Sequence, residues 1–172
     1  MNKVIPAFIY VTFILMLTGC QKKKINNVIY DTIGKKIEMD IHKNNPAQFT
    51  ILRYIDNPTC TSCQLKLGEW KVYYKKMKKM FGDKVGLYFL TETKNIEDAK
   101  FLFKIYGFDD VSAVDSSINF YKTHNLNPIL GKDVVFLLDS TNIILTIGNP
   151  IENLKIDTLF KSVIFDHLSK NE

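Results

Sequence analysis

Two cysteines, Cys60 and Cys63, have the residue type and spacing for covalent chemistry in this chain of 172 residues. They flank Thr61-Ser62 and stand at the start of a helix that the apolar spacing predicts over residues 61–81. Two residues three apart at a helix start lie on one side, within reach of a disulfide bond. Unpaired N–H groups and the positive end of the helix dipole stabilise a thiolate there. We therefore expect Cys60 to attack a substrate disulfide and Cys63 to resolve the mixed disulfide.

Four other kinds of chemistry are conceivable for a pair of cysteines. The two thiols could form an inert structural disulfide. A zinc site needs four ligands, and the sequence has no second Cys-x-x-Cys and no paired histidines. A c-type haem site needs a histidine after the second cysteine, where this chain has Gln64. A copper site completed by His124 is a further alternative, whereas our prediction is that the protein holds no metal and no cofactor.

The third cysteine, Cys20, closes an apolar run from Val4 to Leu17. At about 1.5 Å per residue this run spans roughly 21 Å, which is short of a hydrocarbon core of about 30 Å. The run therefore has the character of an export signal rather than a membrane-spanning helix. Its end, Leu17-Thr18-Gly19-Cys20, resembles the lipobox of bacterial lipoproteins. That resemblance implies lipid attachment at Cys20 and cleavage before it; the alternative is an ordinary cleaved signal with a free Cys20.

The anchor divides the chain into a signal peptide (1–19), a lipidated tether (20–27) and one domain (28–172). It implies a protein of the bacterial cell envelope, held by membrane lipid in the inner or outer membrane, with its domain facing the periplasm. The formal net charge is +5. Lysines 22–24 could touch anionic headgroups or form a solvated tether. Another lysine cluster falls on the polar side of helix 61–81, so we expect no nucleic-acid partner.

The predicted elements alternate between strands and helices, which is typical of an α/β fold with a mixed sheet. A closing hairpin and a final helix complete the pattern. In chain order we expect a hairpin over 28–39 turning at Gly34, a strand over 49–55, the helix over 61–81, a strand over 85–90, a helix over 95–106, a strand over 111–114, a short helix to about 123, strands over 134–138 and 143–147, and a helix over 153–169.

This order, with Cys-x-x-Cys after the first buried strand, resembles the thioredoxin fold and in particular its extracytoplasmic TlpA/ResA-like branch. The resemblance implies a three-layer sandwich in which helices flank a mixed central sheet. It also implies an N-terminal hairpin and an inserted strand–helix unit over about residues 108–124. The implied activity is thiol–disulfide exchange with disulfide or dithiol proteins, with a separate redox partner that recycles the cysteine pair.

The sequence departs from the family at positions that would tune this chemistry. The family usually has a tryptophan before the first cysteine, where this chain has Thr59. It also has a cis-proline before the strand that matches residues 134–138, where this chain has Lys132 and Asp133. A carboxylate near Cys60 would disfavour its thiolate, and Lys132 could offset that effect. These departures motivate an alternative function: a non-catalytic thioredoxin-fold binding or scaffold lipoprotein with a structural disulfide.

Two acidic residues follow the first two buried strands. Asp56 and Glu92 stand at the carboxyl ends of these strands, where sites of α/β folds tend to form. Either residue could accept a proton from Cys63, and the alternative for each is a solvated loop acid.

Overall fold

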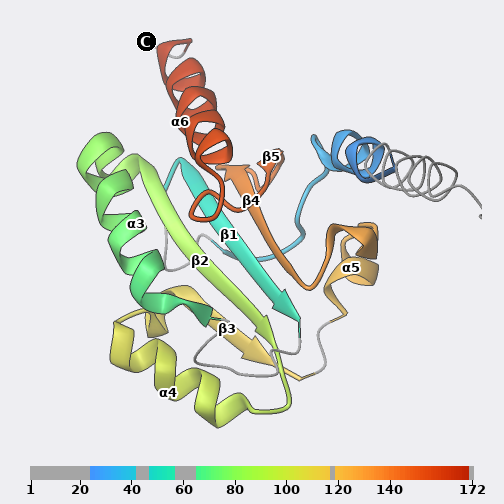
Figure 1. Ribbon diagram of the computed structural model, residues 1–172, viewed down its shortest axis with the longest axis vertical. Helices are drawn as coiled ribbons and strands as arrows, with labels where there is room; N and C mark the ends of the chain where they lie inside the picture. The colour runs from blue at the N-terminus through green and yellow to red at the C-terminus, as the bar shows by residue number, and fades with distance from the viewer. Residues whose placement is uncertain (1–23, 42–46, 57–64, 117–118, 171–172) are drawn as a thin grey trace, which may run out of the picture.

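The structure is a computed structural model that describes residues 24–41, 47–56, 65–116 and 119–170. Residues 1–19, predicted to be a signal peptide, lie outside these ranges, as do Cys20, Thr59, Cys60 and Cys63. Within them, one sheet has the strand order β3-β2-β1-β4-β5, with helices on both faces (Figure 1). None of the helices in these ranges is long and apolar enough to cross a bilayer.

The strand β1 lies at the centre of the sheet. It pairs in parallel with β2 and antiparallel with β4, while β2–β3 is parallel and β4–β5 antiparallel. The mixed sheet expected from the sequence is therefore confirmed. The strands are β1 (Phe49–Asp56), β2 (Val85–Glu92), β3 (Ser112–Asp115), β4 (Asp133–Asp139) and β5 (Ile144–Ile147).

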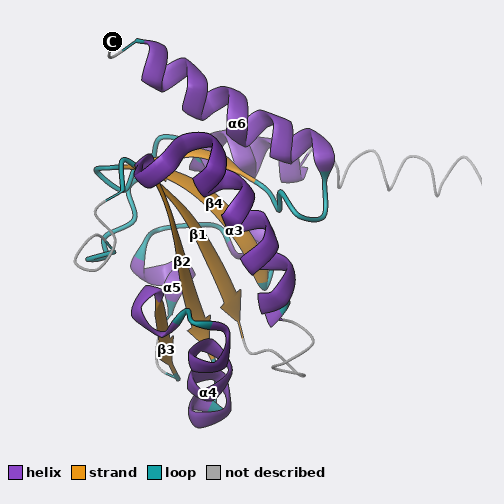
Figure 2. Ribbon diagram, turned by 90° about the vertical axis from the view of Figure 1, so that its left-hand side faces the viewer, coloured by secondary structure: helices purple, strands orange, loops and turns teal. Residues whose placement is uncertain are grey.

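The helices form the outer layers of the sandwich. They are α3 (Leu67–Phe81), α4 (Ile96–Tyr106), α5 (Phe120–Thr123) and α6 (Leu154–Ser169). One face of the sheet packs against buried side chains of α3, α4 and α6. The other face packs against α5 and Ile37 and Ile41 of the N-terminal segment. Figure 2 shows α3 and the sheet from the side. The three-layer sandwich is confirmed, and β3 with α5 forms the inserted strand–helix unit.

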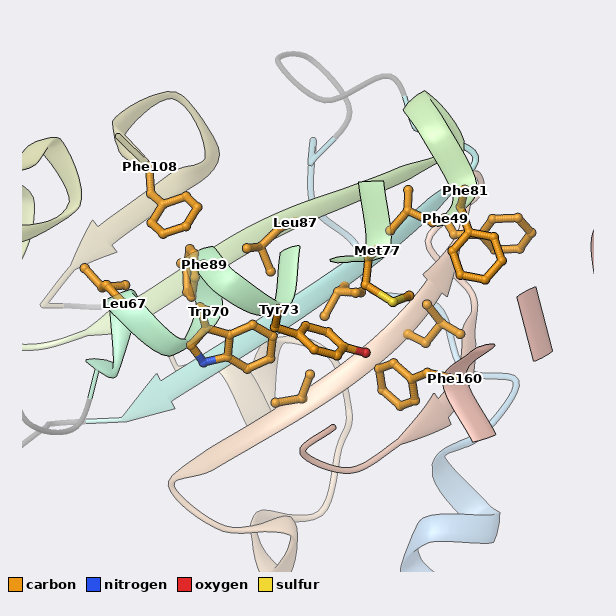
Figure 3. Packing of buried hydrophobic residues seen from close by; sticks show 14 of the residues in the cluster. Phe49, Leu67, Trp70, Tyr73, Met77, Phe81, Leu87, Phe89, Phe108 and Phe160 are labelled. Atoms are coloured by element: carbon orange, nitrogen blue, oxygen red, sulfur yellow. The ribbon is translucent and has the colours of Figure 1, made fainter. Parts of the chain in front are cut away.

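Aromatic side chains fill the core between the sheet and α3 (Figure 3). Phe89 of β2 is fully buried, and its ring lies 6.0 Å from that of Trp70, 5.3 Å from that of Phe103 and 5.1 Å from that of Phe108. The Trp70 ring meets Phe89 edge-on, an arrangement that aligns ring edges with ring faces. This cluster fixes the N-terminal half of α3 on the sheet.

Where the structure describes it, the helix expected over residues 61–81 is helical at Leu65 and again over Leu67–Phe81, with a break at Lys66. The structure starts α3 at Leu67, because Lys66 adopts a left-handed backbone with a φ of 46°. Residues 61–64 lie outside the described ranges. Leu65 is helical and fully buried, so Lys66 interrupts the helix directly after a buried residue.

The N-terminal hairpin is a wrong prediction. Residues 24–32 form a helix instead of a strand. The reason is a helical period: Val28 and Thr32 are four apart and both buried, and Thr32 Oγ1 donates to the Val28 carbonyl at 2.7 Å. The turn at Gly34 is confirmed, with a φ of 87°. After it, Lys36 forms an isolated antiparallel bridge with Ile143 beside β5.

Replacement of the buried Phe89 tests the described core. We expect Phe89→Ala to lower the free energy of unfolding by about 3–5 kcal/mol, because three aromatic neighbours lose their partner and a cavity remains. Phe101→Ala is the matched control, since Phe101 on α4 is 64% exposed, and its cost should stay within about 1 kcal/mol. Urea unfolding measures both changes in the free energy of unfolding. Equal losses for Phe89→Ala and Phe101→Ala would contradict the central place of Phe89 in the core.

Candidate functional site

The candidate site lies where β1 ends and β4 begins. Asp56 ends β1 and precedes residues 57–64, the segment that carries Cys60 and Cys63. The description resumes at Leu65, and α3 starts two residues later. Ile55 pairs with Asp133, the first residue of β4. The fold therefore brings Asp133 to the edge of the sheet from which the cysteine-bearing segment departs.

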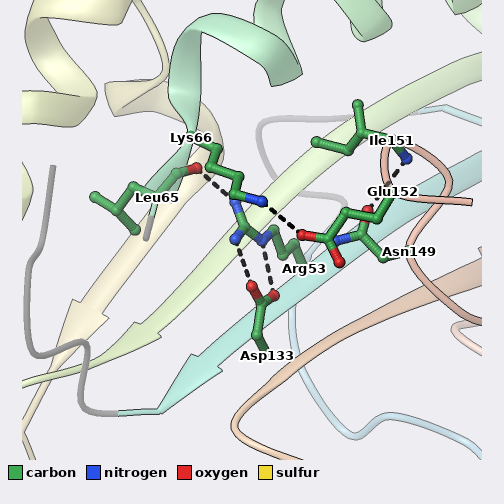
Figure 4. A network of polar contacts seen from close by, with 7 residues as sticks. All are labelled: Arg53, Leu65, Lys66, Asp133, Asn149, Ile151 and Glu152. Atoms are coloured by element: carbon green, nitrogen blue, oxygen red, sulfur yellow. Dashed lines mark hydrogen bonds and ion pairs between the residues drawn. The ribbon is translucent and has the colours of Figure 1, made fainter. Parts of the chain in front are cut away.

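A buried arginine joins these parts of the chain (Figure 4). Arg53 of β1 is fully buried, and its Nε and Nη2 donate to the two carboxylate oxygens of Asp133 at 2.9 and 2.7 Å. Its Nη1 donates to the Leu65 carbonyl at 2.5 Å. Its guanidinium carbon lies 5.4 Å from the centre of the Trp70 ring. One side chain thus holds the start of β4, the chain before α3 and the core of α3.

The contact between Arg53 and Asp133 has the geometry in which a guanidinium forms its strongest hydrogen bonds. A bidentate Arg–carboxylate pair forms two parallel charge-assisted hydrogen bonds. A buried guanidinium is costly unless its N–H groups are satisfied, and here the Leu65 carbonyl and the Trp70 ring add to the carboxylate. Asp133 keeps 37% of its side chain exposed, so the pair reaches from the interior to the surface.

The structure describes Lys132 and Asp133, two of the residues that the sequence suggested as tuning the cysteine pair. Asp133 begins β4 and pairs with Arg53. The predicted roles of Asp133 and Lys132 toward Cys60 stay predictions. Lys132 contributes its backbone carbonyl, which accepts the Asp56 N–H at 2.7 Å, and the residue is exposed. Arg53 was missed, although a charged residue inside an otherwise apolar strand is a signal that the sequence carries.

Asp56 and Glu92 lie side by side, as registered partners at the ends of β1 and β2. A cavity of about 190 Å³ opens beside them, lined also by Thr93, Lys94 and Ser116. Glu92 accepts a hydrogen bond from the Tyr54 hydroxyl at 2.9 Å. Burial and this carboxylate raise the pKa of Tyr54 far above its ordinary value. The role of either acid as proton acceptor for Cys63 stays a prediction.

His124, the alternative copper ligand, directly follows α5 and is buried. Its Nδ1 accepts the Glu38 backbone N–H at 3.2 Å, and its ring lies 4.8 Å from that of Phe120. Burial lowers the pKa of His124, while the Glu38 carboxylate acts more weakly in the opposite direction. Within the described ranges, no group of three or more histidine, cysteine or acidic side chains is arranged to hold a metal.

Comparison with solved structures shows what this arrangement resembles. A Chlorobium tepidum protein described as the thiol:disulfide interchange protein DsbE superposes with a TM-score of 0.55 at 12% identity, covering 76% of this chain and 96% of that one. A domain of a Cytophaga hutchinsonii protein described as a thiol-disulfide isomerase gives 0.51 at 20% identity, with 81% and 97% covered. The fold is thioredoxin-like. A Bacteroides thetaiotaomicron protein described as a protein disulfide isomerase gives 0.52 at 12% identity, with 76% and 87% covered.

The likeness to these structures is one of fold. No family model and no curated protein matches the sequence. In this thioredoxin-like fold, the structure places Lys132 and Asp133 at the carboxyl end of β1. Cys20, Thr59, Cys60 and Cys63 lie outside the residues that it describes, so their roles stay predictions.

The burial of His124 predicts a pH dependence of stability. The unfolded chain binds a proton on this histidine near pH 6.5, whereas folded His124 resists protonation. The contribution of His124 to the free energy of unfolding is therefore fully present above about pH 6.5. It is lost as the pH falls from there toward the lower pKa of His124 in the folded protein. Urea unfolding between pH 5 and 8 measures it. His124→Asn, which keeps an acceptor for the Glu38 N–H, should reduce the slope; an unchanged slope would contradict the assignment.

Proposed function

We propose that this chain is a membrane-anchored, extracytoplasmic thiol–disulfide oxidoreductase that uses Cys60 and Cys63. The observation that supports the proposal is positional. In a thioredoxin-like fold, the segment that carries Cys-x-x-Cys joins the central strand β1 to the long helix α3. A thiolate at such a position is favoured by the N–H groups of the helix start.

The proposed exchange proceeds in two balanced steps. The Cys60 thiolate attacks one sulfur of a substrate disulfide, the S–S bond breaks, and the other substrate sulfur leaves as a thiolate that takes up a proton. The Cys63 thiolate then attacks the Cys60 sulfur of the mixed disulfide and releases the second substrate thiolate. Two electrons have passed to the substrate, and Cys60–Cys63 is oxidised. The reverse sequence oxidises a dithiol, and a separate redox partner sets the direction.

A second candidate is a non-catalytic binding or scaffold lipoprotein. Asp133 favours this second candidate. It stands at the place where the family has a cis-proline, and its carboxylate forms an ion pair with Arg53. The two functions differ in the stability of the disulfide. A reduction potential below about −300 mV, in the range of structural disulfides, would favour the scaffold, and rapid reversible exchange would exclude it.

Substitution of each cysteine tests the proposed mechanism. We expect Cys63→Ser to accumulate mixed disulfides through Cys60, because the resolving thiol is gone. Cys60→Ser should trap none and should lose about a hundredfold or more of the wild-type rate on a disulfide substrate, because the nucleophile is gone. Non-reducing electrophoresis and a reductase assay measure both. The proposed enzyme activity would be refuted if the wild-type protein showed no exchange activity and Cys63→Ser trapped no mixed disulfide.

Substitution of the third cysteine tests the anchor. A chain with Cys20→Ala offers no thiol for lipid attachment, so we expect it to lose acyl labelling and to leave the membrane fraction. Several acyl chains give lasting attachment where one gives only marginal binding, so the shift should be nearly complete. Cys60→Ser is the matched control and should stay with the membranes. Acyl labelling that persists in Cys20→Ala would contradict the lipobox.

A further inference from the structure

A groove runs along the surface between α3 and the first half of α6. It has a volume of about 600 Å³, and its lining comes from both helices and from the loop after β5. Val72 of α3 and Leu154 of α6 line it and are 57% and 79% exposed. Pro150 and Ile151 add to its apolar lining. Apolar side chains gathered in this way beside one groove indicate a surface that another molecule covers.

The two helices that form the groove run side by side in the same direction (Figure 2). Directly before the helices, Lys66 Nζ donates to Glu152 Oε1 at 2.7 Å. Beyond the groove, the rings of Phe81 and Phe165 lie 4.8 Å apart. Successive turns of α3 therefore lie beside successive turns of α6, and the order of residues along one helix matches the order along the other.

The end of the groove nearest the helix starts is acidic. Glu69 and Glu152 line it there. Lys66 forms an ion pair with Glu152 and compensates one of these two carboxylates. One formal negative charge therefore remains at this end of the groove.

The other end of the groove is basic. Lys76 and Lys161 line it, each further along its helix than the acidic residues. Asp157 Oδ2 lies 2.6 Å from Lys161 Nζ and compensates one of these two ammonium groups. One formal positive charge remains, so the groove carries opposite charges at its two ends.

The lysine-rich side of α3 starts on the side of the helix that faces α4. Lys71 Nζ donates to the Tyr106 carbonyl of α4 at 3.1 Å. Lys75 follows Lys71 by four residues and therefore lies on the same side of α3. The charges of Lys71 and Lys75 thus lie outside the groove and leave its order of charges intact.

We propose that this groove is a two-fold interface with a second copy of the same chain. An antiparallel second copy brings the negative end of each groove against the positive end of the other, and a two-fold axis makes both contacts at once. Glu69 and Lys76 are two helical turns apart, about 10 Å, with Val72 near the midpoint. The axis passes close to Val72, and Glu69 of one copy faces Lys76 of the other. The interface goes beyond the exchange chemistry proposed above and does not depend on it.

The order of charges favours a second copy over a partner surface of a single sign. Such a surface would be attracted by one end of the groove and repelled by the other, whereas a second copy satisfies both ends. Exposed ion pairs add little binding free energy. The charges therefore set the orientation of the two copies, and burial of the Val72 and Leu154 side chains supplies the affinity.

Cross-linking at the axis tests the placement of the second copy. Val72→Cys in the full chain is combined with Cys60→Ser and Cys63→Ser, so that the cysteine pair does not compete. A short bifunctional thiol reagent should then give a covalent dimer. Phe101→Cys in the same background is the matched control, because Phe101 on α4 is similarly exposed, and it should give far less dimer. Equal dimer yields from Val72→Cys and Phe101→Cys would overturn the proposal.

A charge swap tests the contact between the two ends of the groove. Lys76→Glu alone and Glu69→Lys alone each place like charges opposite one another in both symmetry-related contacts. The dissociation constant of the dimer should therefore rise at least about tenfold in each variant. The double variant reverses both ends and restores opposite charges, so its dissociation constant should return to within about threefold of the wild-type value. Sedimentation equilibrium of the full chain in density-matched detergent measures these constants.

Lys75→Glu is the matched control for the charge swap. It makes the same change of charge on the same helix but outside the groove, so the dissociation constant should change by less than about twofold. A wild-type chain that stays monomeric at about 100 μM, well above the dissociation constants of specific interfaces, would overturn the proposal. The same result is expected if a different protein occupies the groove. A double variant that does not regain dimerisation would also overturn it.

Discussion

A guanidinium buried in the central strand constrains the rest of this structure, because each of its N–H groups needs an acceptor that water does not supply. Arg53 meets this need with Asp133, which fixes the start of β4, and with the Leu65 carbonyl, which fixes the approach to α3. Its guanidinium also lies over Trp70, which belongs to the core of α3. Arg53 therefore contacts the sheet, the helix α3 and the sheet edge where the candidate site lies.

Hydrophobic packing builds the layers around that contact. The core between the sheet and α3, α4 and α6 is largely aromatic and aliphatic, and the opposite core joins α5 to the N-terminal segment. Because both faces of β1 are covered, any polar group on it has to be satisfied inside the protein. The ion pair extends from this interior to a half-exposed carboxylate, which connects the core to the surface where exchange is proposed.

Local patterns predicted most of the fold, and long-range pairing explains most of what they missed. The apolar runs around Ile51 and Leu87 indicated buried strands, and Gly107, with a φ of 72°, ends α4 where the sequence placed its end. The N-terminal hairpin failed because the helical spacing of Val28 and Thr32 outweighed a strand pattern over few residues. Arg53 and Asp133 are 80 residues apart, so no local window joins them. The site was predicted by motif and fold likeness; its charge balance could come only from the tertiary structure.

The segment after Gly34 has a consequence for how the molecule meets other protein chains. The Gly34 N–H donates to the Ile144 carbonyl at 2.8 Å, the Ile144 N–H donates to the Lys35 carbonyl at 2.9 Å, and Lys36 bridges Ile143. These bonds occupy the outer edge of β5, which would otherwise offer free N–H and C=O groups to a strand of another chain. The opposite edge is the four-residue strand β3, too short to template extensive pairing. The N-terminal segment thus protects the sheet against edge-to-edge aggregation.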